Sequence, residues 1–571
     1  MTRPSIMGLT IVLIFAVAAT AAQMPSSATQ PEAQLLQLSS PIERQLAVGE
    51  THAYKINLDA GVFLDAAVNQ RGVDVIVRLF APDGAKIADI DSPNGRQGDE
   101  PIALEVKTSG AYRIEVTSLE KTAITPAGRY EIRINAILSP TEYASRLADK
   151  KRKQEAVIAA LRANSISIKS VEAGNGFADL QPLRKILKDA RFVGLGEETH
   201  GTREFFQFKH RMLEFLVKEM GFRVFAIEAS YSACQNINDY ITGKMNDGGQ
   251  ALDSQGFWTW NTQEVRAMMD WMRSYNASVP SDRRIKFAGF DIQANETGKN
   301  KLLEYLKRVA PERLPDTEAF FKTDTSALVE TSFFAKGDAA KDARAKLKEL
   351  KSQYNDLLAF FEISEPLLSV KSSQAEYEEM REYARVLAQY IDVYSRPNLS
   401  GSLRDVYMAD NFRRTVNRES VGTKFIIWAH NQHIASGGRQ PSLGSHLRDY
   451  YGSEYYAVGF SFNQGSFQAM EAQPKDPGRP GPVSFTVNPA PVDSIDWYLA
   501  ETKAKAGFID LRAAAKNQAI ADWIGAAHPM RAFGAVFDPK DEKRYVVSTV
   551  LKQGFDGLFF VDTTTRARPN H

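Results

Sequence analysis

The sequence has one cysteine, almost no net charge, and no long apolar run beyond its first two dozen residues. The single cysteine, Cys234, excludes an internal disulfide, and we expect it to be a small buried hydrophobic side chain. A formal charge of +1 over 571 residues gives no electrostatic footprint for nucleic acid. The missing apolar runs argue against a transmembrane helix further along the chain. The length leaves room for two or more domains with sizeable cores.

Familiar catalytic signatures are also absent. There is no G-x-S-x-G elbow, which argues against a serine hydrolase of that kind, and no HExxH helix. The turn at Gly194-x-Gly196 superficially resembles a dinucleotide loop. Its spacing to Gly201 is wrong, however, and the two glutamates that follow would repel a pyrophosphate. Any chemistry must come from residues that these motifs do not describe.

The N-terminus has the layout of a secretory signal peptide. Arg3 provides a basic start, Met7–Ala18 an apolar segment, and Ala19–Ala21 a small-residue exit. We predict a signal peptide over residues 1–22 and a periplasmic or secreted protein; the alternative is an uncleaved membrane anchor. No cysteine follows the apolar segment directly, so a lipid anchor is not expected. Residues 23–37 are rich in Ser, Pro, Ala and Gln and predict a disordered linker.

Residues 38–138 have the texture of a small all-β domain. Runs of alternating hydrophobicity are separated by turn signals, and these runs are His52–Leu58, Val75–Phe80, Ile102–Val106, Tyr112–Val116 and Tyr130–Ile134. Strands at this spacing predict a β-sandwich of the jelly-roll type. Residues 139–165 are charged and helix-prone and predict a linking helix.

Residues 166–571 alternate between strand-like and helical segments. In the stretch from Arg191 to Ser230, the apolar run Phe192–Leu195 precedes a helical pattern that stops at Gly221, and Val224–Ile227 is a second apolar run. Further strand-like runs are Ile285–Phe290, Phe425–Trp428, Tyr455–Phe460, Phe508–Leu511 and Leu558–Val561. This order predicts an α/β domain with a mainly parallel sheet and helices on both faces. Two apolar stripes at about 311–395 predict a two-helix insertion.

Acids and imidazoles gather where these strands end. Glu197 and His200 follow the first strand, Glu228 ends the second, and Asp291, His430 and His433 follow later strands; Arg404 is added from a preceding helix. The carboxyl ends of parallel strands meet at one edge of a sheet, where open α/β sheets bind ligands. We therefore predict the site at this edge.

The motifs around these residues resemble, in order, those of the erythromycin esterase family. They are Gly196-Glu197-x-x-His200-Gly201-Thr202-x-Glu204-Phe205, Gly221-Phe222, Glu228, Trp258-x-Trp260 with Glu264, Gly289-Phe290-Asp291, Arg404-Asp405-x-x-Met408-Ala409-x-Asn411 and Trp428-Ala429-His430-Asn431-x-His433. The resemblance covers about four hundred residues. It implies an α/β hydrolase of macrolide lactone esters that needs no metal or other cofactor. The sandwich is similar to the bacterial pre-peptidase C-terminal domain, and the similarity is carried by Tyr54, Gly61, Asp74, Pro82, Asp83, Gly84, Gly110, Tyr112, Gly128 and Tyr130.

By this resemblance His200 is the general base, and Glu197, Glu228, His430 and His433 are its partners. Lys209 falls where the family tends to carry a basic residue. Histidine titrates near pH 6.5 and can take a proton from water at neutral pH. A carboxylate such as Glu197 or Glu228 can hold the imidazole tautomer. His433, His430 and Arg404 are candidate donors to the oxyanion.

Other readings stay open at this point. His430-x-x-His433 with Glu197 and Glu228 could form a zinc site. The same broad fold includes haem- or iron-binding proteins, and an enzyme of envelope polysaccharide or secondary metabolism with another ester substrate is a further alternative. Trp258 and Trp260 either pack a helix that begins near Thr262 or form an apolar wall for a large ligand. We expect a small ester or lactone as the substrate, with Arg404, Trp258, Trp260, Lys209 and Asp291 as binding residues.

Overall fold

The computed structural model describes residues 33–92, 94–120, 128–293, 296–335, 337–396, 399–438, 440–472 and 481–570. The chain divides into two compact units, Met1–Tyr143 and Ala144–His571. The predicted signal peptide and most of the predicted linker lie outside the described residues. Within the described part of the chain, no helix combines the length and the apolarity needed to cross a bilayer.

The first unit consists of two β-sheets that share one core. One sheet has the strand order β1 (Gln34–Leu35), β3 (Thr51–Leu58), β8 (Gly110–Ser118), β5 (Val75–Phe80) and β6 (Lys86–Ile90), and the other β2 (Ile42–Gln45), β9 (Arg129–Leu138), β4 (Phe63–Arg71) and β7 (Gln97–Glu105). Apart from β1 with β3, the strands pair antiparallel. Alternate residues such as Val75, Val77 and Leu79 point into the shared core. Strands β2, β4 and β6 were not among the predicted runs, and the sequence of β4, FLDAAVNQR, does not alternate cleanly.

The second unit is built on a mainly parallel sheet. Its strand order is β10 (Ser165–Ser167), β17 (Ala506–Asp510), β21 (Gly557–Thr564), β15 (Tyr455–Glu471), β11 (Phe192–Leu195), β14 (Phe425–Trp428), β12 (Val224–Ser230) and β13 (Lys286–Asp291). From β21 to β13 every pair is parallel. At the other edge, β10 and β17 run antiparallel. The predicted α/β class is confirmed.

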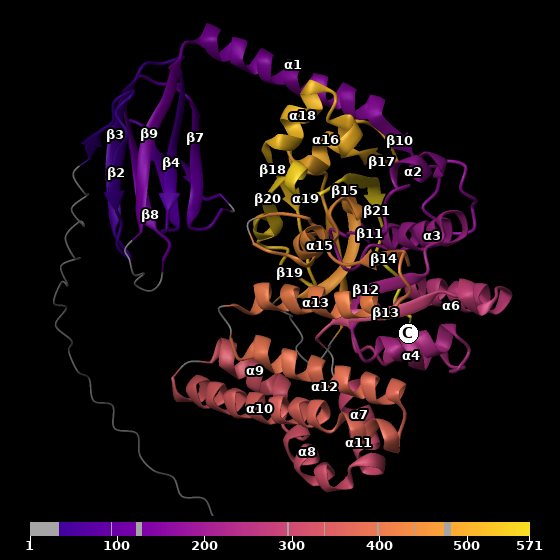
Figure 1. The fold of residues 1–571 in the computed structure, drawn as a ribbon. Helices are drawn as coiled ribbons and strands as arrows, with labels where there is room; N and C mark the ends of the chain where they lie inside the picture. The colour runs from indigo at the N-terminus through magenta and orange to yellow at the C-terminus, as the bar shows by residue number, and fades with distance from the viewer. Residues whose placement is uncertain are drawn as a thin grey trace, which may run out of the picture. The chain divides into compact units, whose positions relative to one another are not determined.

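Side chains of the central strands alternate between two cores, one on each face of the sheet. Phe192 of β11 belongs to one core and Val193 to the other. One face is covered by α2 (Gln181–Ile186), α3 (Arg203–Met220), α4 (Cys234–Ile241), α5 (Gly248–Asp253) and α6 (Gln263–Ser278). The other is covered by α13 (Ser400–Asn417), α15 (Leu443–Tyr451), α16 (Ile495–Glu501), α17 (Leu511–Ala514), α18 (Gln518–Gly525), α19 (Leu551–Gly554) and the later part of α1 (Pro140–Asn164). Figure 1 shows the sheet between these helices. Burial on both faces explains why the central strands are short apolar runs.

Shorter elements extend β15 beyond the sheet. Its outer half pairs with β16 (Val483–Val487) and β19 (Val536–Phe537). A separate ribbon is formed by β18 (Ala527–Arg531) and β20 (Val546–Val550). A short helix, α14 (Asn431–Ile434), follows β14 directly. These pieces surround the carboxyl edge of the sheet.

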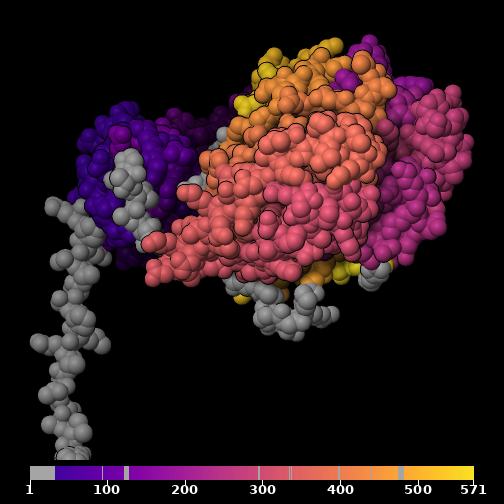
Figure 2. Space-filling view, turned by 60° about the horizontal axis from the view of Figure 1, so that its bottom comes forward, coloured from indigo at the N-terminus to yellow at the C-terminus, as the bar shows by residue number. Residues whose placement is uncertain are grey.

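The helical insertion is larger than the sequence indicated. The two apolar stripes belong to α10 (Asp338–Ile363) and α12 (Gln374–Tyr394), which pack against each other as predicted. They share a core with α7 (Glu296–Val309), α8 (Leu314–Phe321), α9 (Thr325–Phe334) and α11 (Glu365–Lys371). Helices α8, α9 and α11 are too short to show a clear helical period, so the prediction of two helices was wrong. Figure 2 shows the insertion, from pink to salmon, as one closely packed surface.

Candidate active site

The loop after β11 is held by close approaches of backbone. Gly196 N donates to Val458 O at 2.9 Å, and a Cβ at Gly196 would collide with Asn431 Oδ1. A Cβ at Gly201 would collide with Gln468 O. The loop lies so close to β15 and α14 that only glycine fits at both places. These contacts fix the positions of Glu197 and His200, which lie between the two glycines in the sequence.

Glu197 and His200 form an imidazole–carboxylate pair. His200 Nδ1 lies 2.7 Å from Glu197 Oε1, and the other carboxylate oxygen accepts from Lys209 Nζ at 2.5 Å and Trp428 Nε1 at 2.6 Å. Burial raises the pKa of Glu197, but the Lys209 ammonium and the His200 hydrogen bond outweigh burial and hold that pKa below its usual value. The ionised carboxylate must accept from Nδ1–H. The lone pair of His200 is therefore on Nε2.

His200 Nε2 is turned toward open space. It makes no hydrogen bond to any residue that the structure describes, and the side chain is 13% exposed. Trp260 stands edge-on to the ring at a centroid distance of 5.8 Å. A water molecule can thus approach Nε2 without displacing a protein partner.

Glu228 is the carboxylate around which the remaining charges collect. Its Oε1 accepts from Arg404 Nη2 at 2.8 Å and lies 3.3 Å from His433 Nε2, and its Oε2 accepts from His430 N at 2.9 Å. Burial raises the pKa of Glu228, yet the cationic neighbours His433 and Arg404 outweigh burial and hold it well below its usual range. Trp260 Nε1 donates to the backbone oxygen of Glu228 at 3.1 Å. Glu228 is therefore ionised at neutral pH.

Arg404 joins Glu228 to Asp291. Its Nε donates to Asp291 Oδ1 at 3.0 Å, and Nη2 donates to Asp291 Oδ2 at 2.9 Å. Burial lowers the pKa of Arg404, but Asp291 and Glu228 outweigh burial and raise it well above its usual value. The planar fork of a guanidinium suits this double contact. The result is a fixed cation held by carboxylates from two adjacent strands.

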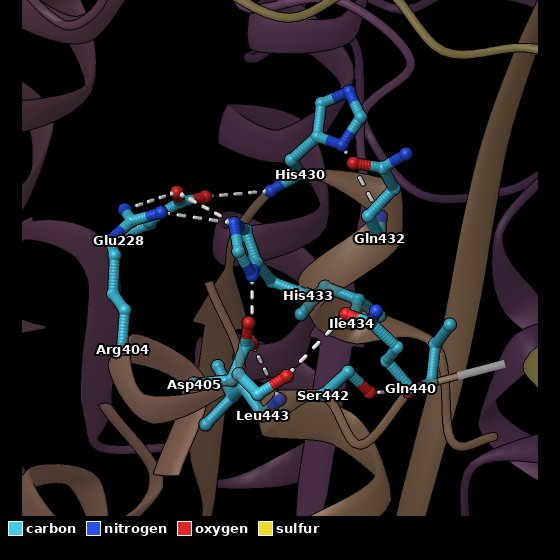
Figure 3. Close-up of polar contacts among 12 residues, drawn as sticks. Glu228, Arg404, Asp405, His430, Gln432, His433, Ile434, Gln440, Ser442 and Leu443 are labelled. Atoms are coloured by element: carbon cyan, nitrogen blue, oxygen red, sulfur yellow. Dashed lines mark hydrogen bonds and ion pairs between the residues drawn. The ribbon is translucent and has the colours of Figure 1, made fainter. Parts of the chain in front are cut away.

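His433 belongs to a second imidazole–carboxylate pair. Its Nδ1 lies 2.8 Å from Asp405 Oδ1, which also accepts from Leu443 N at 2.7 Å. Figure 3 shows the His433 ring between Asp405 on one side and Glu228 with Arg404 on the other. Burial lowers the pKa of His433, but the Glu228 and Asp405 carboxylates outweigh burial and raise it. Arg404 Nη1 also lies 3.2 Å from His433 Nε2.

His430 has the opposite character. It is buried, and burial together with the neighbouring His200 lowers its pKa to about 4. Its Nδ1 accepts from Gln432 N at 3.3 Å, so Nε2–H donates to Phe533 O at 3.2 Å. Its ring lies 5.1 Å from that of His200, centroid to centroid. His430 is a neutral imidazole with both nitrogens occupied.

These side chains surround one small cavity of about 200 Å³ at the carboxyl edge of the sheet. Its walls are His200, Glu228, Phe257, Thr259, Trp260, Asp291, Gln293, Arg404, His430, Gln432, His433, Gly534 and Ala535. Most of the predicted residues meet here. Glu197 stands immediately behind His200.

Two predicted binding residues have other positions. Lys209 is fully buried and lies against Glu197 and the Trp428 ring, so it supports the carboxylate from behind and does not face the cavity. Trp258 is half-buried and does not line the cavity, whereas Trp260 does. Among the described residues, no cluster of three or more His, Cys, Asp or Glu side chains has the arrangement of a metal site.

Sequence reasoning did not single out Asp405, Gln432 or the segment around Phe533. Asp405 follows Arg404 on α13, inside a motif that the sequence displays. Phe533 contributes a backbone oxygen, and no residue type marks such a contact in advance. Only the first of these had a usable signal in the sequence.

A family model described as erythromycin esterase matches residues 217–564, more than half of the chain. Erythromycin esterase type II from Escherichia coli is 27% identical over 323 residues, covering 52% of this chain and 74% of that protein. The putative hydrolase YbfO from Bacillus subtilis is 23% identical over 418 residues, covering 68% of this chain and 86% of that protein. The loop that carries Glu197 and His200 lies before the matched residues of the family model.

Solved structures show the same fold. A protein from Bacillus cereus has a TM-score of 0.62 at 24% identity and covers 73% of this chain and 99% of its own. An erythromycin esterase crystallised in its open conformation has a TM-score of 0.51 at 19% identity and covers 69% of this chain and 96% of its own. An N-terminal segment resembles the pre-peptidase C-terminal domain of a Bacillus anthracis collagenase, with 19% identity over 19% of this chain, all of that chain and a TM-score of 0.16.

Proposed function

The chain belongs to the erythromycin esterase family, and from this membership and the geometry of the site we propose that it hydrolyses a carboxylic ester with water activated by His200. The observation that carries the proposal is the free Nε2 of His200. That nitrogen faces a cavity whose other walls include Arg404 and His433, while Nδ1 is held by Glu197. A base, a guanidinium and a second imidazole thus border the same small space.

In the first step, His200 Nε2 takes a proton from water as the water oxygen attacks the ester carbonyl carbon. Positioned bases of this kind contribute about 10²–10⁴ in rate. Glu197 remains ionised and stabilises the imidazolium that forms, because its second oxygen is already neutralised by Lys209. The developing oxyanion lies toward Arg404 and His433, where fixed positive charge lowers its energy.

In the second step, the carbon–oxygen bond to the alcohol breaks. The departing alkoxide takes the proton from His200 Nε2, which returns the base to its starting form. The products are a carboxylic acid and an alcohol, or one hydroxy acid when the substrate is a lactone. Each atom of the water is accounted for, and the reaction consumes no other reactant.

The proposal extends to a macrolide lactone as one candidate substrate, because two relatives carry the name erythromycin esterase. The decisive experiment compares wild type with His200→Gln on a small activated ester and on a macrolide. Turnover of whichever ester is cleaved should fall by about 10²–10⁴. His446→Gln is the matched control, since His446 lies on α15 outside the cavity. Equal loss in both variants, or none in His200→Gln, would refute the assignment.

A further inference from the structure

A second and larger cavity, of about 660 Å³, lies next to the candidate active site. It is formed by the start of α13, the residues between α14 and α15, the β18–β20 ribbon and α19. Its walls include Asp405, Gln432, His433, Ala527, Arg531 and Ser548. Of the residues to which the proposed mechanism gives a role, only His433 faces this space.

The two cavities share a thin wall. On α13, Arg404 lines the smaller cavity and the next residue, Asp405, lines the larger one. Gln432 and His433 of α14 line both. The view in Figure 3 has Glu228 and Arg404 on one side of His433 and Ser442 on the other. Side chains of α14 therefore separate the two spaces.

The two side chains of this wall differ in how firmly they are held. His433 is fixed by Asp405 and Glu228, as described above. Gln432 is exposed, and its side-chain amide makes no hydrogen bond within the described part of the chain. Exposed side chains change rotamer within nanoseconds. Gln432 is thus the part of the wall that can turn aside.

The larger cavity is suited to an uncharged ligand. Asp405, Arg531 and the titratable His433 are the groups among the described wall residues that can carry charge, and each already has a partner. Asp405 and His433 bind each other, and Arg531 binds Asn463 O, Asn488 O and Glu542. The remaining wall is mainly small and apolar, with Ser442, Ser548 and Thr549 offering hydroxyl groups. Burying a ligand charge here without a partner would be costly.

The two cavities differ in volume and therefore suit different parts of the substrate. Pockets for ligands of drug size are about 300–1,000 Å³, so the smaller cavity accommodates an ester group and little more. We propose that the larger cavity receives the bulky, uncharged and mainly apolar part of the ester substrate, with Gln432 as the specificity-determining side chain at the passage. This inference rests on the proposed hydrolysis and names its substrate class: neutral esters or lactones with a large apolar body.

The test uses tryptophan substitutions at exposed positions of the wall to reduce the volume of the larger cavity. Ala527→Trp and Ser548→Trp place an indole on β18 or β20, where both residues are exposed and line the larger cavity. Val421→Trp, at a fully exposed position outside both cavities, is the matched control. Each protein is assayed with an acetate ester, with esters enlarged on the acyl side or on the alcohol side, and with an enlarged ester that carries a terminal carboxylate.

We expect the wild type to favour a large neutral ester over its carboxylate analogue by about tenfold or more, and each cavity variant to lower the ratio of large-ester to acetate kcat/KM by about tenfold. Gln432→Ala should raise the same ratio, and Val421→Trp should leave it unchanged. Unchanged ratios in both tryptophan variants, with esterase activity retained, would overturn the inference.

A binding measurement separates this inference from the proposed reaction. Nile red, an uncharged apolar dye, is titrated against the same proteins. We expect about tenfold weaker binding in Ala527→Trp and Ser548→Trp than in Val421→Trp. If no ester is cleaved but this difference appears, the hydrolase proposal fails while the cavity assignment stands. If dye binding is the same in all variants, the cavity assignment fails whatever the activity.

Discussion

Lys209 Nζ and Glu197 Oε2 lie 2.5 Å apart, and neither side chain has any exposure to solvent. Removing one charge of a buried pair leaves the other uncompensated, which costs about 3–5 kcal/mol. We expect Lys209→Met to lower the free energy of unfolding by about that amount and to raise the pKa of Glu197. Urea denaturation measures the first effect. Lys218→Met, on the exposed part of the same helix, should change stability by less than about 0.5 kcal/mol.

The same pair offers a second check. In the double variant Glu197→Gln with Lys209→Met, no buried charge is left, so much of the lost stability should return. Esterase activity should not return with it, because a neutral amide in place of the Glu197 carboxylate would no longer stabilise an imidazolium at His200. If the double variant is as unstable as Lys209→Met, the cost comes from packing and the electrostatic account is wrong.

The free energy of unfolding should decrease as the pH is lowered through the range in which His430 is protonated in the unfolded chain. Its pKa is about 4 in the folded protein and near 6.5 when unfolded, so between these values the unfolded chain binds a proton that the folded protein does not. The contribution of neutral His430 to the free energy of unfolding is fully present above pH 6.5. It is lost as the pH falls toward 4, with a slope of about 1.4 kcal/mol per pH unit. Urea melts of wild type and His430→Gln between pH 7 and 4 measure it. Identical slopes would show that His430 does not titrate in this way.

Asp405 should set the pH range of activity through His433. The Asp405 carboxylate helps to raise the pKa of His433, so Asp405→Asn should lower it. If the His433 cation is needed for the oxyanion, the alkaline fall of kcat/KM should move to lower pH in this variant, while activity in the acidic range is less affected. A uniform loss at every pH would indicate a purely structural role. Asp449→Asn, at an exposed position on α15, is a control that should leave the pH profile unchanged.

Gly196 should not tolerate even one added methyl group. The Cβ of Gly196→Ala would collide with Asn431 Oδ1 and lie 2.9 Å from Val458 O. Overpacking of this kind costs about 1–3 kcal/mol. We expect a lower melting temperature and a loss of esterase activity, because the displaced loop carries Glu197 and His200. Gly438→Ala is the comparison, since no described atom lies within 4 Å of its added Cβ.

The strands and their carboxyl ends could be predicted because they depend on local pattern. Phe192–Leu195 and Phe425–Trp428 are apolar runs flanked by polar groups, and the structure has strands at these same residues. Lys209 was predicted to bind the substrate, although its position in the sequence indicated burial. It stands four residues after Phe205 and four before Leu213, on the buried stripe of α3. A lysine on such a stripe requires an internal anion, which points to Glu197.

Contacts made by backbone, and contacts between distant segments, could not be predicted. Phe533 O accepts from His430 across more than a hundred residues of sequence. The pairing of Asp405 with His433 depends on how α13 packs beside α14, which no periodicity specifies. The larger cavity likewise forms between elements that are each unremarkable as sequence.

The position of β11 in the sheet has a consequence for biosynthesis. Within the described residues, its neighbours are β14 and β15, and both are translated more than two hundred residues after it. While the ribosome is still making the helical insertion, neither of the strands that pair with β11 has been synthesised. Long-range pairings of this kind form slowly and late. A nascent chain cut short before β15 would contain Glu197 and His200 but not the strand against which their loop packs. We expect such a fragment to lack the proposed activity.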